Sequence, residues 1–222
     1  MQRNGTVAMN GGAQGGKSRG ARFGRVTILA AAVAGLALSL PARAQFSGSF
    51  KFLEAVRKKE GDKVESALST PGATIVNTRD VTTGETALHI VTARRDLTWL
   101  QFLMGRGANV NARDGQGRTP LQVATNLGWR DGVAALLQKR ANTEVANDAG
   151  ETPLIAAVHR RDVEMTKLLL EAGADPDRSD NSGRSARDYA QLDQSSAIIA
   201  AIKTETKPGA HEANKPTYGP AL

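Results

Sequence analysis

The chain has 222 residues, of which 40% are hydrophobic and only 4% aromatic, and it contains no cysteine. Small interlocking helices suit this composition better than a β-sandwich or barrel, which relies on aromatic and β-branched residues. The lack of cysteine excludes disulfides, thiolate metal sites, cysteine nucleophiles and lipidation of an N-terminal cysteine. The formal charge is +7, but residues 1–44 hold six basic and no acidic residues, which leaves +1 for the rest. Nucleic-acid binding by the rest of the chain therefore loses its main support.

Residues 1–44 have the charge and hydropathy order of a cleavable secretion signal. Basic residues from Lys17 to Arg25 precede an apolar run over residues 26–40, and small residues follow in Ala42-Arg43-Ala44. We predict cleavage after Ala44 by signal peptidase. The run of 15 residues is shorter than the roughly 20 that a membrane-spanning helix needs, so an uncleaved anchor is the weaker alternative.

The sequence also bears on the export route of this leader and on the residue at which it starts. No Arg-Arg pair precedes the apolar run, which favours the general secretory route over the twin-arginine route. The leader is long for a signal peptide, and Met9 is an alternative start to Met1. The sequence therefore predicts a periplasmic or secreted protein and leaves open which of the two.

A repeat of 33 residues fills the middle of the chain. Glycine recurs at Gly84, Gly117, Gly150 and Gly183, and a hydroxyl residue follows two positions later, at Thr86, Thr119, Thr152 and Ser185. Downstream, Gly107-Ala108-Asn109, Arg140-Ala141-Asn142 and Gly173-Ala174-Asp175 keep the same spacing. The opening G-x-T-P-L-H pattern, the paired leucines and the closing G-A-[DN] resemble the ankyrin-repeat family.

The resemblance implies an all-α fold, an ankyrin-repeat solenoid of stacked helix-turn-helix units joined by β-turn or hairpin loops. It also divides the chain. The expected parts are a signal peptide at 1–44, a repeat domain at 45–203 and a disordered tail at 204–222. Within the domain we expect an N-terminal cap at about 49–80, repeats at about 80–112, 113–145 and 146–178, and a C-terminal cap at about 179–203.

The residues of each repeat support this fold without the family. The threonines can cap helices, and Pro120 and Pro153 stand where a first-turn proline removes no hydrogen bond. Gly107 and Gly173 suit left-handed helix ends. Apolar spacing predicts two short amphipathic helices in each repeat. The predicted buried positions are Leu88, Val91, Leu100 and Leu103, then Leu121, Ala124, Val133 and Leu136, then Leu154, Ala157, Leu168 and Leu169.

The second repeat departs most from the pattern. Arg130 and Gly132 replace larger apolar residues, and Arg140 replaces the terminal glycine. A glycine inside a helix costs roughly 1 kcal/mol against alanine, and a left-handed arginine costs about as much. Our hypothesis is that Trp129 folds across the helix turn and covers the gap; if it does not, Trp129 is an exposed binding residue.

No arrangement of residues predicts catalysis, a cofactor or a metal site. His89 stands in the repeat motif, where the resemblance implies a structural role in tying neighbouring loops, and His211 lies in the tail. The three histidines share no metal-ligand spacing. Asp175 and Asp177 look like a carboxylate pair, but Asn109 with Asn111 occupies the same places, which favours a turn-stabilising role. We therefore expect no enzyme activity.

Solenoids bind partners on an extended concave surface, and the resemblance implies loop tips and first helices as the contact points. The predicted tip residues are Thr82, Thr83, Glu85, Gln116, Arg118, Asp148, Glu151, Asn181 and Arg184. The predicted helix-side residues are Arg94, Asn126, Leu127, His159 and Arg160. The mixed charge of this set favours a protein partner with interleaved charges, although an ordinary solvated surface would look the same.

The leading interpretation is a monomeric adaptor or scaffold that binds another protein. Two alternatives remain: an inhibitor or protective partner of an exported enzyme, and a secreted effector directed at a host. The sequence does not identify the partner.

Overall fold

The computed structural model describes residues 40–69 and 74–205, with side chains from Gly48 onward. Most of the predicted leader and nearly all of the predicted tail, residues 206–222, lie outside these ranges. The first described helix, α1 (Leu40–Lys58), runs through the predicted cleavage site after Ala44. Across the described ranges, no helix combines the length and the apolar character needed to cross a membrane.

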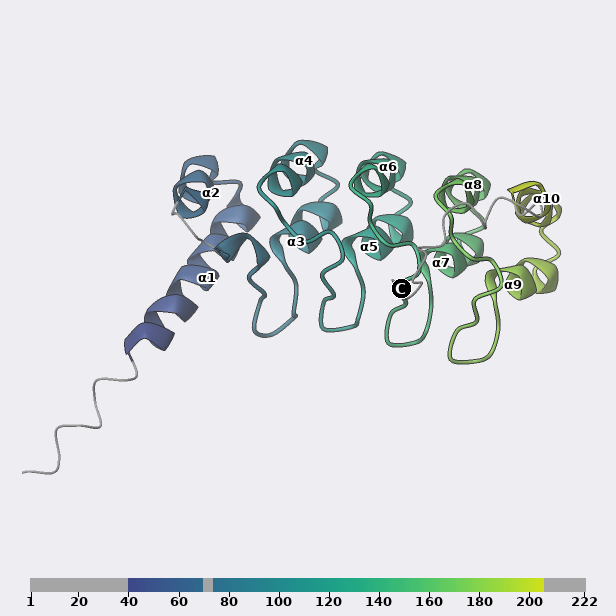
Figure 1. Ribbon diagram of the computed structural model, residues 1–222, viewed down its shortest axis with the longest axis horizontal. Helices are drawn as coiled ribbons and strands as arrows, with labels where there is room; N and C mark the ends of the chain where they lie inside the picture. The colour runs from purple at the N-terminus through teal and green to yellow at the C-terminus, as the bar shows by residue number, and fades with distance from the viewer. Residues whose placement is uncertain (1–39, 70–73, 206–222) are drawn as a thin grey trace, which may run out of the picture. The chain divides into compact units, whose positions relative to one another are not determined.

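The described residues form five pairs of antiparallel helices (Figure 1). First helices pack side by side along the stack, from α1 through α3, α5 and α7 to α9. The second helices form a row above them, and the loops project below. The remaining bounds are α2 Gly61–Leu68, a 3-10 turn Ile75–Asn77, α3 Ala87–Ala93, α4 Leu97–Gly105, α5 Pro120–Asn126, α6 Arg130–Gln138, α7 Pro153–His159, α8 Val163–Glu171, α9 Ala186–Leu192 and α10 Ser196–Glu205.

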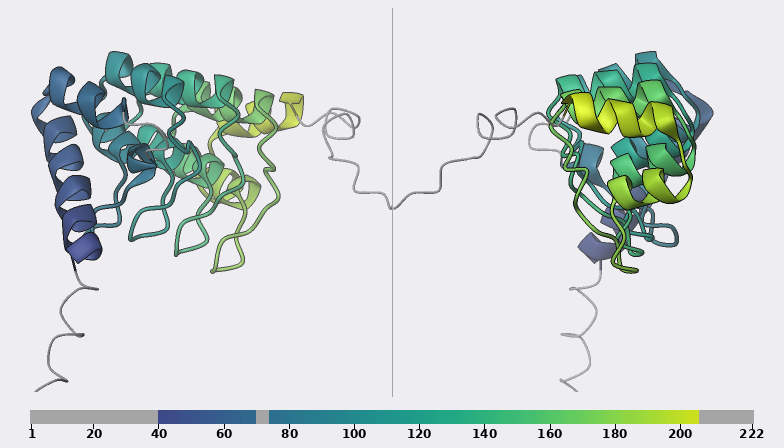
Figure 2. Two further views of the ribbon diagram at one scale, coloured as in Figure 1. Left: turned by 60° about the vertical axis from the view of Figure 1, so that its left-hand side comes forward. Right: turned by 90° about the vertical axis from the view of Figure 1, so that its right-hand side faces the viewer.

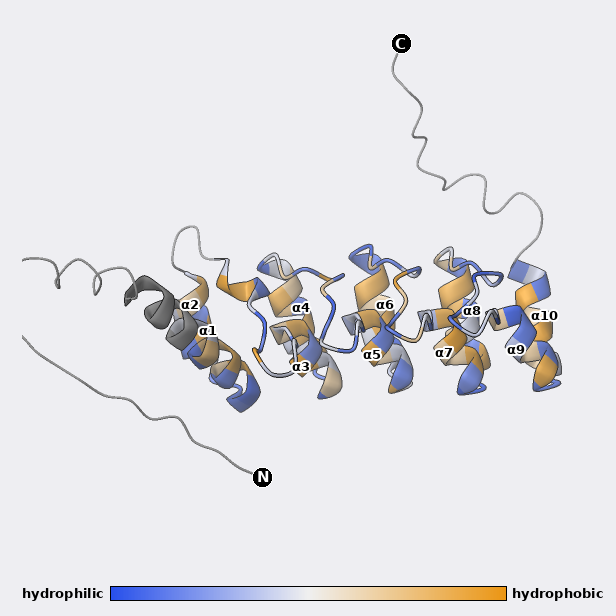
Figure 3. Ribbon diagram, turned by 90° about the horizontal axis from the view of Figure 1, so that it is seen from below, coloured by the Kyte–Doolittle hydropathy of each residue, from blue (hydrophilic) through white to orange (hydrophobic). Residues whose placement is uncertain are grey.

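This arrangement confirms the predicted all-α repeat fold. Each unit makes its main contacts with its neighbours in sequence, as a solenoid must. The loops face the viewer in Figure 3 and are mostly hydrophilic, whereas the helices carry the apolar stretches. Two isolated antiparallel bridges, Arg79 to Thr86 and Ser179 to Ser185, are the only β-structure in the described part of the chain.

The starts of the first helices follow the expected capping chemistry. Thr119 and Thr152 each accept a hydrogen bond from the backbone N–H three residues on, at 3.3 Å. Pro120 and Pro153 occupy the first turn, where the missing N–H leaves no unmet bond. Each cap stabilises its helix by about 1 kcal/mol.

The second helices are capped differently. Asp96 accepts from the N–H of Trp99 at 3.3 Å and Asp162 from the N–H of Met165 at 3.0 Å. In the second repeat the same place holds Trp129, which makes no side-chain cap. Helix α6 therefore begins without the anchor that α4 and α8 share.

The core lies between the helices and matches the predicted positions with one correction. The predicted leucines, valines and alanines are at most 1% exposed in the first two repeats. In the third, Leu168 is only partly buried, and the inner position belongs to Thr166, which is fully buried and donates to the Asp162 carbonyl at 2.8 Å. Thr166 keeps the strict 33-residue spacing from Val133. The expectation for Leu168 was wrong because it favoured an apolar residue over the repeat spacing.

Trp129 covers the gap in the second repeat, as predicted. It is 8% exposed, and a Cβ added to Gly132 would overlap the indole ring. The ring thus occupies the space into which the side chain of residue 132 would otherwise extend. The glycine, expected to weaken α6, is instead needed for this packing. Arg140 does adopt the expected left-handed backbone, with φ of 58°.

Candidate functional site

Each loop that projects below the first helices is built on an Asx turn. Asp114 Oδ1 accepts from the backbone N–H groups of Gln116 and Arg118, both at 2.9 Å. Asp80, Asn147 and Asp180 make the same kind of turn in the other loops. Carboxylates that accept such bonds are stabilised in their charged form. A hydrogen bond from Arg57, followed by the bonds from two backbone N–H groups, lowers the pKa of Asp80 to about 2.

Neighbouring loops are hydrogen-bonded to one another at their tips. The N–H of Gly115 donates to the Thr83 carbonyl at 2.8 Å, and the N–H of Asp148 donates to the Gln116 carbonyl at 3.2 Å. Asn181 repeats the contact with the Ala149 carbonyl at 3.2 Å. The four loops therefore form one continuous, hydrogen-bonded row. The left view of Figure 2 shows the loops side by side, and the right view looks along them from the C-terminal end of the stack.

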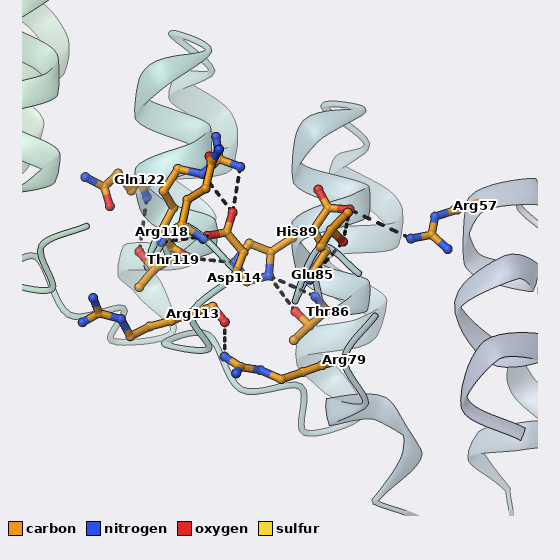
Figure 4. Close-up of polar contacts among 12 residues, drawn as sticks. Arg57, Arg79, Glu85, Thr86, His89, Arg113, Asp114, Arg118, Thr119 and Gln122 are labelled. Atoms are coloured by element: carbon orange, nitrogen blue, oxygen red, sulfur yellow. Dashed lines mark hydrogen bonds and ion pairs between the residues drawn. The ribbon is translucent and has the colours of Figure 1, made fainter. Parts of the chain in front are cut away.

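His89 ties two of these loops together (Figure 4), as the resemblance to ankyrin repeats implied. The N–H of Thr86 donates to His89 Nδ1 at 3.2 Å, so the proton sits on Nε2, which donates to the Arg118 carbonyl at 2.9 Å. Burial lowers the pKa of His89 below its usual value, which keeps the ring neutral. Gln122 makes the equivalent bond to the Glu151 carbonyl at 2.5 Å. Ile155 has no polar side-chain group with which to do so.

The carboxylate-like pairs hold turns, which confirms their expected structural role. The backbone N–H of Asn111 donates to Asn109 Oδ1, and that of Asp177 donates to Asp175 Oδ1, both at 2.9 Å. The described residues contain no group of three or more His, Cys, Asp or Glu side chains that could hold a metal ion.

The predicted tip residues all lie along the loop row but differ in how free they are. Five are exposed: Thr82, Gln116, Asp148, Asn181 and Arg184. Thr83 is exposed as well, but it bonds Glu85 at 3.1 Å. Arg118 and Glu151 are held by neighbours, Arg118 by Asp114 at 2.7 Å and Glu151 by His159 at 3.0 Å. Among the exposed tips, Asn181 also donates to the Asp148 carbonyl at 2.9 Å, and the Asp148 carboxylate lies 3.6 Å from Arg113. The row therefore combines exposed tips with side chains that are held by their neighbours.

His159 belongs to a cluster that the sequence did not predict. Its ring meets Tyr189 edge to face, with centroids 4.4 Å apart, and Tyr189 donates its hydroxyl to Asp180 at 2.7 Å. That bond and a second from Ser182 lower the pKa of Asp180. A tyrosine nine residues after the loop aspartate was the available signal. Asn126 and His159 are exposed, and Leu127 is half-buried.

Arg94 and Arg160, predicted as partner contacts, brace the stack. Arg94 donates to the Val56 carbonyl at 2.6 Å, and Arg160 donates to the Asn126 carbonyl at 2.8 Å. Both carbonyls lie at the end of the preceding unit's first helix, where acceptors lack partners within the helix. Arg94 is only 20% exposed, whereas Arg160 remains exposed. An arginine directly after the first helix in both the first and the third repeat was the sequence signal for this role.

The surface is hollowed between α2 and α4 and again among the loops. A hollow of about 260 Å³ between α2 and α4 is lined by Trp99 and Phe102 beside Glu65. A polar hollow of about 540 Å³ lies among the loops of the later repeats, where Arg113, Glu144 and Arg178 contribute charges.

Comparison with known proteins identifies the family to which these repeats belong. Residues 52–147 match the family model described as ankyrin repeats (3 copies), and residues 136–190 match that described as ankyrin repeats (many copies). The chain is 30% identical over 132 residues to the B-cell lymphoma 3 protein homolog of Mus musculus, covering 57% of this chain and 29% of that protein. It is 36% identical over 122 residues to neurogenic locus notch homolog protein 1 of Danio rerio, covering 54% and 5%.

A putative ankyrin repeat-containing protein of Treponema pallidum (strain Nichols) is 36% identical over 91 residues, covering 40% of this chain and 30% of that protein. The chain thus spans less than a third of the length of these curated relatives. What the two family matches and the relatives share with this chain is the repeat region. The helix caps recur every 33 residues, neighbouring loops are hydrogen-bonded to one another, and the helices are paired. The chain belongs to the ankyrin-repeat family.

Proposed function

We propose that this chain is a non-enzymatic protein-binding module that acts as an adaptor or scaffold in the bacterial periplasm or outside the cell. The observation that carries the proposal is the loop row: four hydrogen-bonded loops with exposed polar tips such as Gln116, Asp148 and Arg184. Ankyrin-type solenoids use such surfaces to bind other proteins. Fixed tips favour binding because little conformational entropy is lost on association.

Export is the second part of the proposal and rests on the leader of residues 1–44. Cleavage after Ala44 would remove roughly the first turn of α1 and leave the buried residues Phe52, Leu53 and Val56 in place. N-terminal sequencing of protein from a cell fraction tests this directly. The expected first residue is Gln45, in a periplasmic or culture fraction; an intact Met1 or Met9 in the cytoplasm would refute export.

The binding role is tested by capture with charge-exchanged variants. Asp148→Lys together with Arg184→Glu alters two exposed tips and keeps the net charge. Glu164→Lys with Lys167→Glu, a pair on the second-helix side joined at 3.3 Å, is the matched control. Wild-type protein and the control should capture the same protein from periplasmic extract, and the tip variant should capture less. Equal capture by all three would place the contact elsewhere.

The same experiment separates the adaptor from the inhibitor. An inhibitor should capture an enzyme and lower the activity of that enzyme when the two are mixed. An adaptor should leave such activity unchanged. Cell fractionation separates both from an effector released to a host.

A further inference from the structure

The turn between the paired helices differs among the repeats in a way that the proposed function does not use. The first repeat has Arg94-Arg95-Asp96 there, and the third has Arg160-Arg161-Asp162. The second has Leu127-Gly128-Trp129, with neither arginine nor aspartate. Arginine side chains from the two neighbouring repeats supply the positive charge that this turn lacks.

Two arginines from opposite sides converge on the turn of the second repeat. Arg95 reaches forward and donates from Nη2 to the Leu127 carbonyl at 2.5 Å. Arg160 reaches back and donates from Nη1 to the Asn126 carbonyl at 2.8 Å. The two acceptors are consecutive carbonyls at the end of α5, where the helix dipole is negative. The guanidinium groups are therefore fixed on either side of one turn.

Gly128 provides the space between them. Its φ is 65°, a left-handed value, and a Cβ there would lie 2.7 Å from Nη2 of Arg160. With no side chain at this position, the Arg160 guanidinium lies directly beside the Gly128 backbone, and both Arg95 and Arg160 are exposed.

Neither arginine has an acidic partner among the residues that the structure describes. Other arginines in or next to these turns do: Arg94 lies 3.5 Å from Asp96, Arg130 lies 3.1 Å from Asp162 and Arg161 lies 3.5 Å from Asp193. Arg95 and Arg160 each spend one N–H on a carbonyl and keep the rest of the five guanidinium donors. Two like charges held together without a counter-charge favour a carboxylate, which guanidinium binds with two parallel bonds.

We propose that Arg95 and Arg160, on either side of Gly128, bind a carboxylate side chain from an acidic segment of a protein partner. This rests on the proposed protein-binding function and adds a contact on the edge formed by the helix-helix turns. Asp96, Asp162 and Asp193 on the same edge pair with flanking arginines. Among the described residues of this edge, the positive charge without a counter-charge is therefore confined to Arg95 and Arg160, too small a patch to hold a nucleic acid or an anionic membrane. A protein segment can interleave its charges with these carboxylates.

A first test needs no partner. Gly128→Asp places a carboxylate at the site, whereas Gly128→Asn has nearly the same shape without charge, and both residues tolerate a left-handed backbone. Thermal unfolding at low salt should give the aspartate variant the higher Tm, and the difference should shrink as salt screens the pairing. An aspartate variant no more stable than the asparagine variant would show that the site does not hold a carboxylate.

The second test measures binding of a labelled peptide of alternating Glu and Gly by fluorescence anisotropy with the full chain. Arg95→Gln with Arg160→Gln should weaken binding by about tenfold or more. The matched control, Lys139→Gln with Arg140→Gln, removes two other exposed basic residues that have no ion pair within the described part of the chain and lie outside the loop row, and it should change binding little. Gly128→Asp should weaken binding as the double variant does, which separates loss of the site from loss of folding.

The outcomes distinguish this inference from the proposed function. Equal weakening by both pairs of variants would indicate general charge attraction and overturn the site. Binding to phosphatidylglycerol vesicles but not to the peptide would also overturn it, in favour of a membrane. If the Arg95→Gln/Arg160→Gln variant still captures the wild-type partner at full strength, the site is wrong while the protein-binding function stands.

Discussion

The second and third repeats reach the same architecture by different means. Helices α5 and α7 have seven residues each, and α6 and α8 have nine. The third repeat begins α8 with its own Asp162 cap, whereas the second begins α6 with Trp129 and no side-chain cap. The second repeat keeps its fold by an indole ring over Gly132 and by arginines from both neighbours.

This difference shows how a degenerate repeat persists in a solenoid. Because each unit contacts its neighbours, a missing interaction can be replaced from across the boundary. The replacement makes the second repeat depend on residues that a scan of its own sequence does not include. The third repeat should be less sensitive to such changes.

The largest expected effect is loss of the indole. Trp129→Ala should lower the free energy of unfolding by about 3 kcal/mol, because it leaves a cavity over a glycine that cannot fill it. Urea unfolding of the full chain measures this loss. Adding Gly132→Met, with Trp129→Asp in place of alanine, recreates the third repeat's pattern and should recover part of it. An unchanged midpoint for Trp129→Ala would return Trp129 to the list of binding residues.

A smaller loss is expected when the glycine is filled. Gly132→Ala should destabilise the chain by about 1 to 3 kcal/mol through overlap with Trp129, despite the gain in helix propensity. Gly105→Ala is the control, since a Cβ at this helical glycine meets nothing within 4 Å. Thermal unfolding should show opposite signs for the two substitutions. Stabilisation by both would mean that the indole moves aside without cost.

The cap of the third repeat offers the next effect. Asp162→Ala removes the bond to the Met165 N–H and should cost about 1 kcal/mol. Asp162→Asn keeps the cap but loses the ion pair with Arg130, which is exposed and should contribute little. Chemical denaturation that gave equal losses for both variants would assign the stability to the ion pair.

The smallest expected effect is a pH dependence from His89. Its folded-state pKa lies below 6.5, so the unfolded chain binds the proton more readily. The contribution of neutral His89 to the free energy of unfolding should therefore be fully present above pH 6.5 and decline as the pH falls towards the folded-state pKa. His89→Gln, which imitates Gln122, should remove this component. The difference between the two proteins isolates His89, because the other histidines are in both and Asp80 titrates near pH 2.

The sequence predicted the repeats, their caps and most of the core because these depend on local spacing. The 33-residue period placed Thr86, Thr119 and Thr152 at helix starts, and periodicity placed the buried leucines. It also predicted that Trp129 covers Gly132, since the two lie within one helix turn. It wrongly placed Leu168 in the core. The residue buried at the corresponding position of the repeat is Thr166, which a search for apolar residues passes over because it is polar.

Contacts between repeats were decided only by the tertiary structure. Whether an arginine is a free tip or a brace depends on which carbonyl lies within reach one unit away, as with Arg94 and Val56 or Arg160 and Asn126. The pairing of His159 with Tyr189, thirty residues later, is of the same kind. Periodicity fixes where a residue lies within its own unit, but its neighbours across the boundary depend on how units stack, and stacking is what buries the helices.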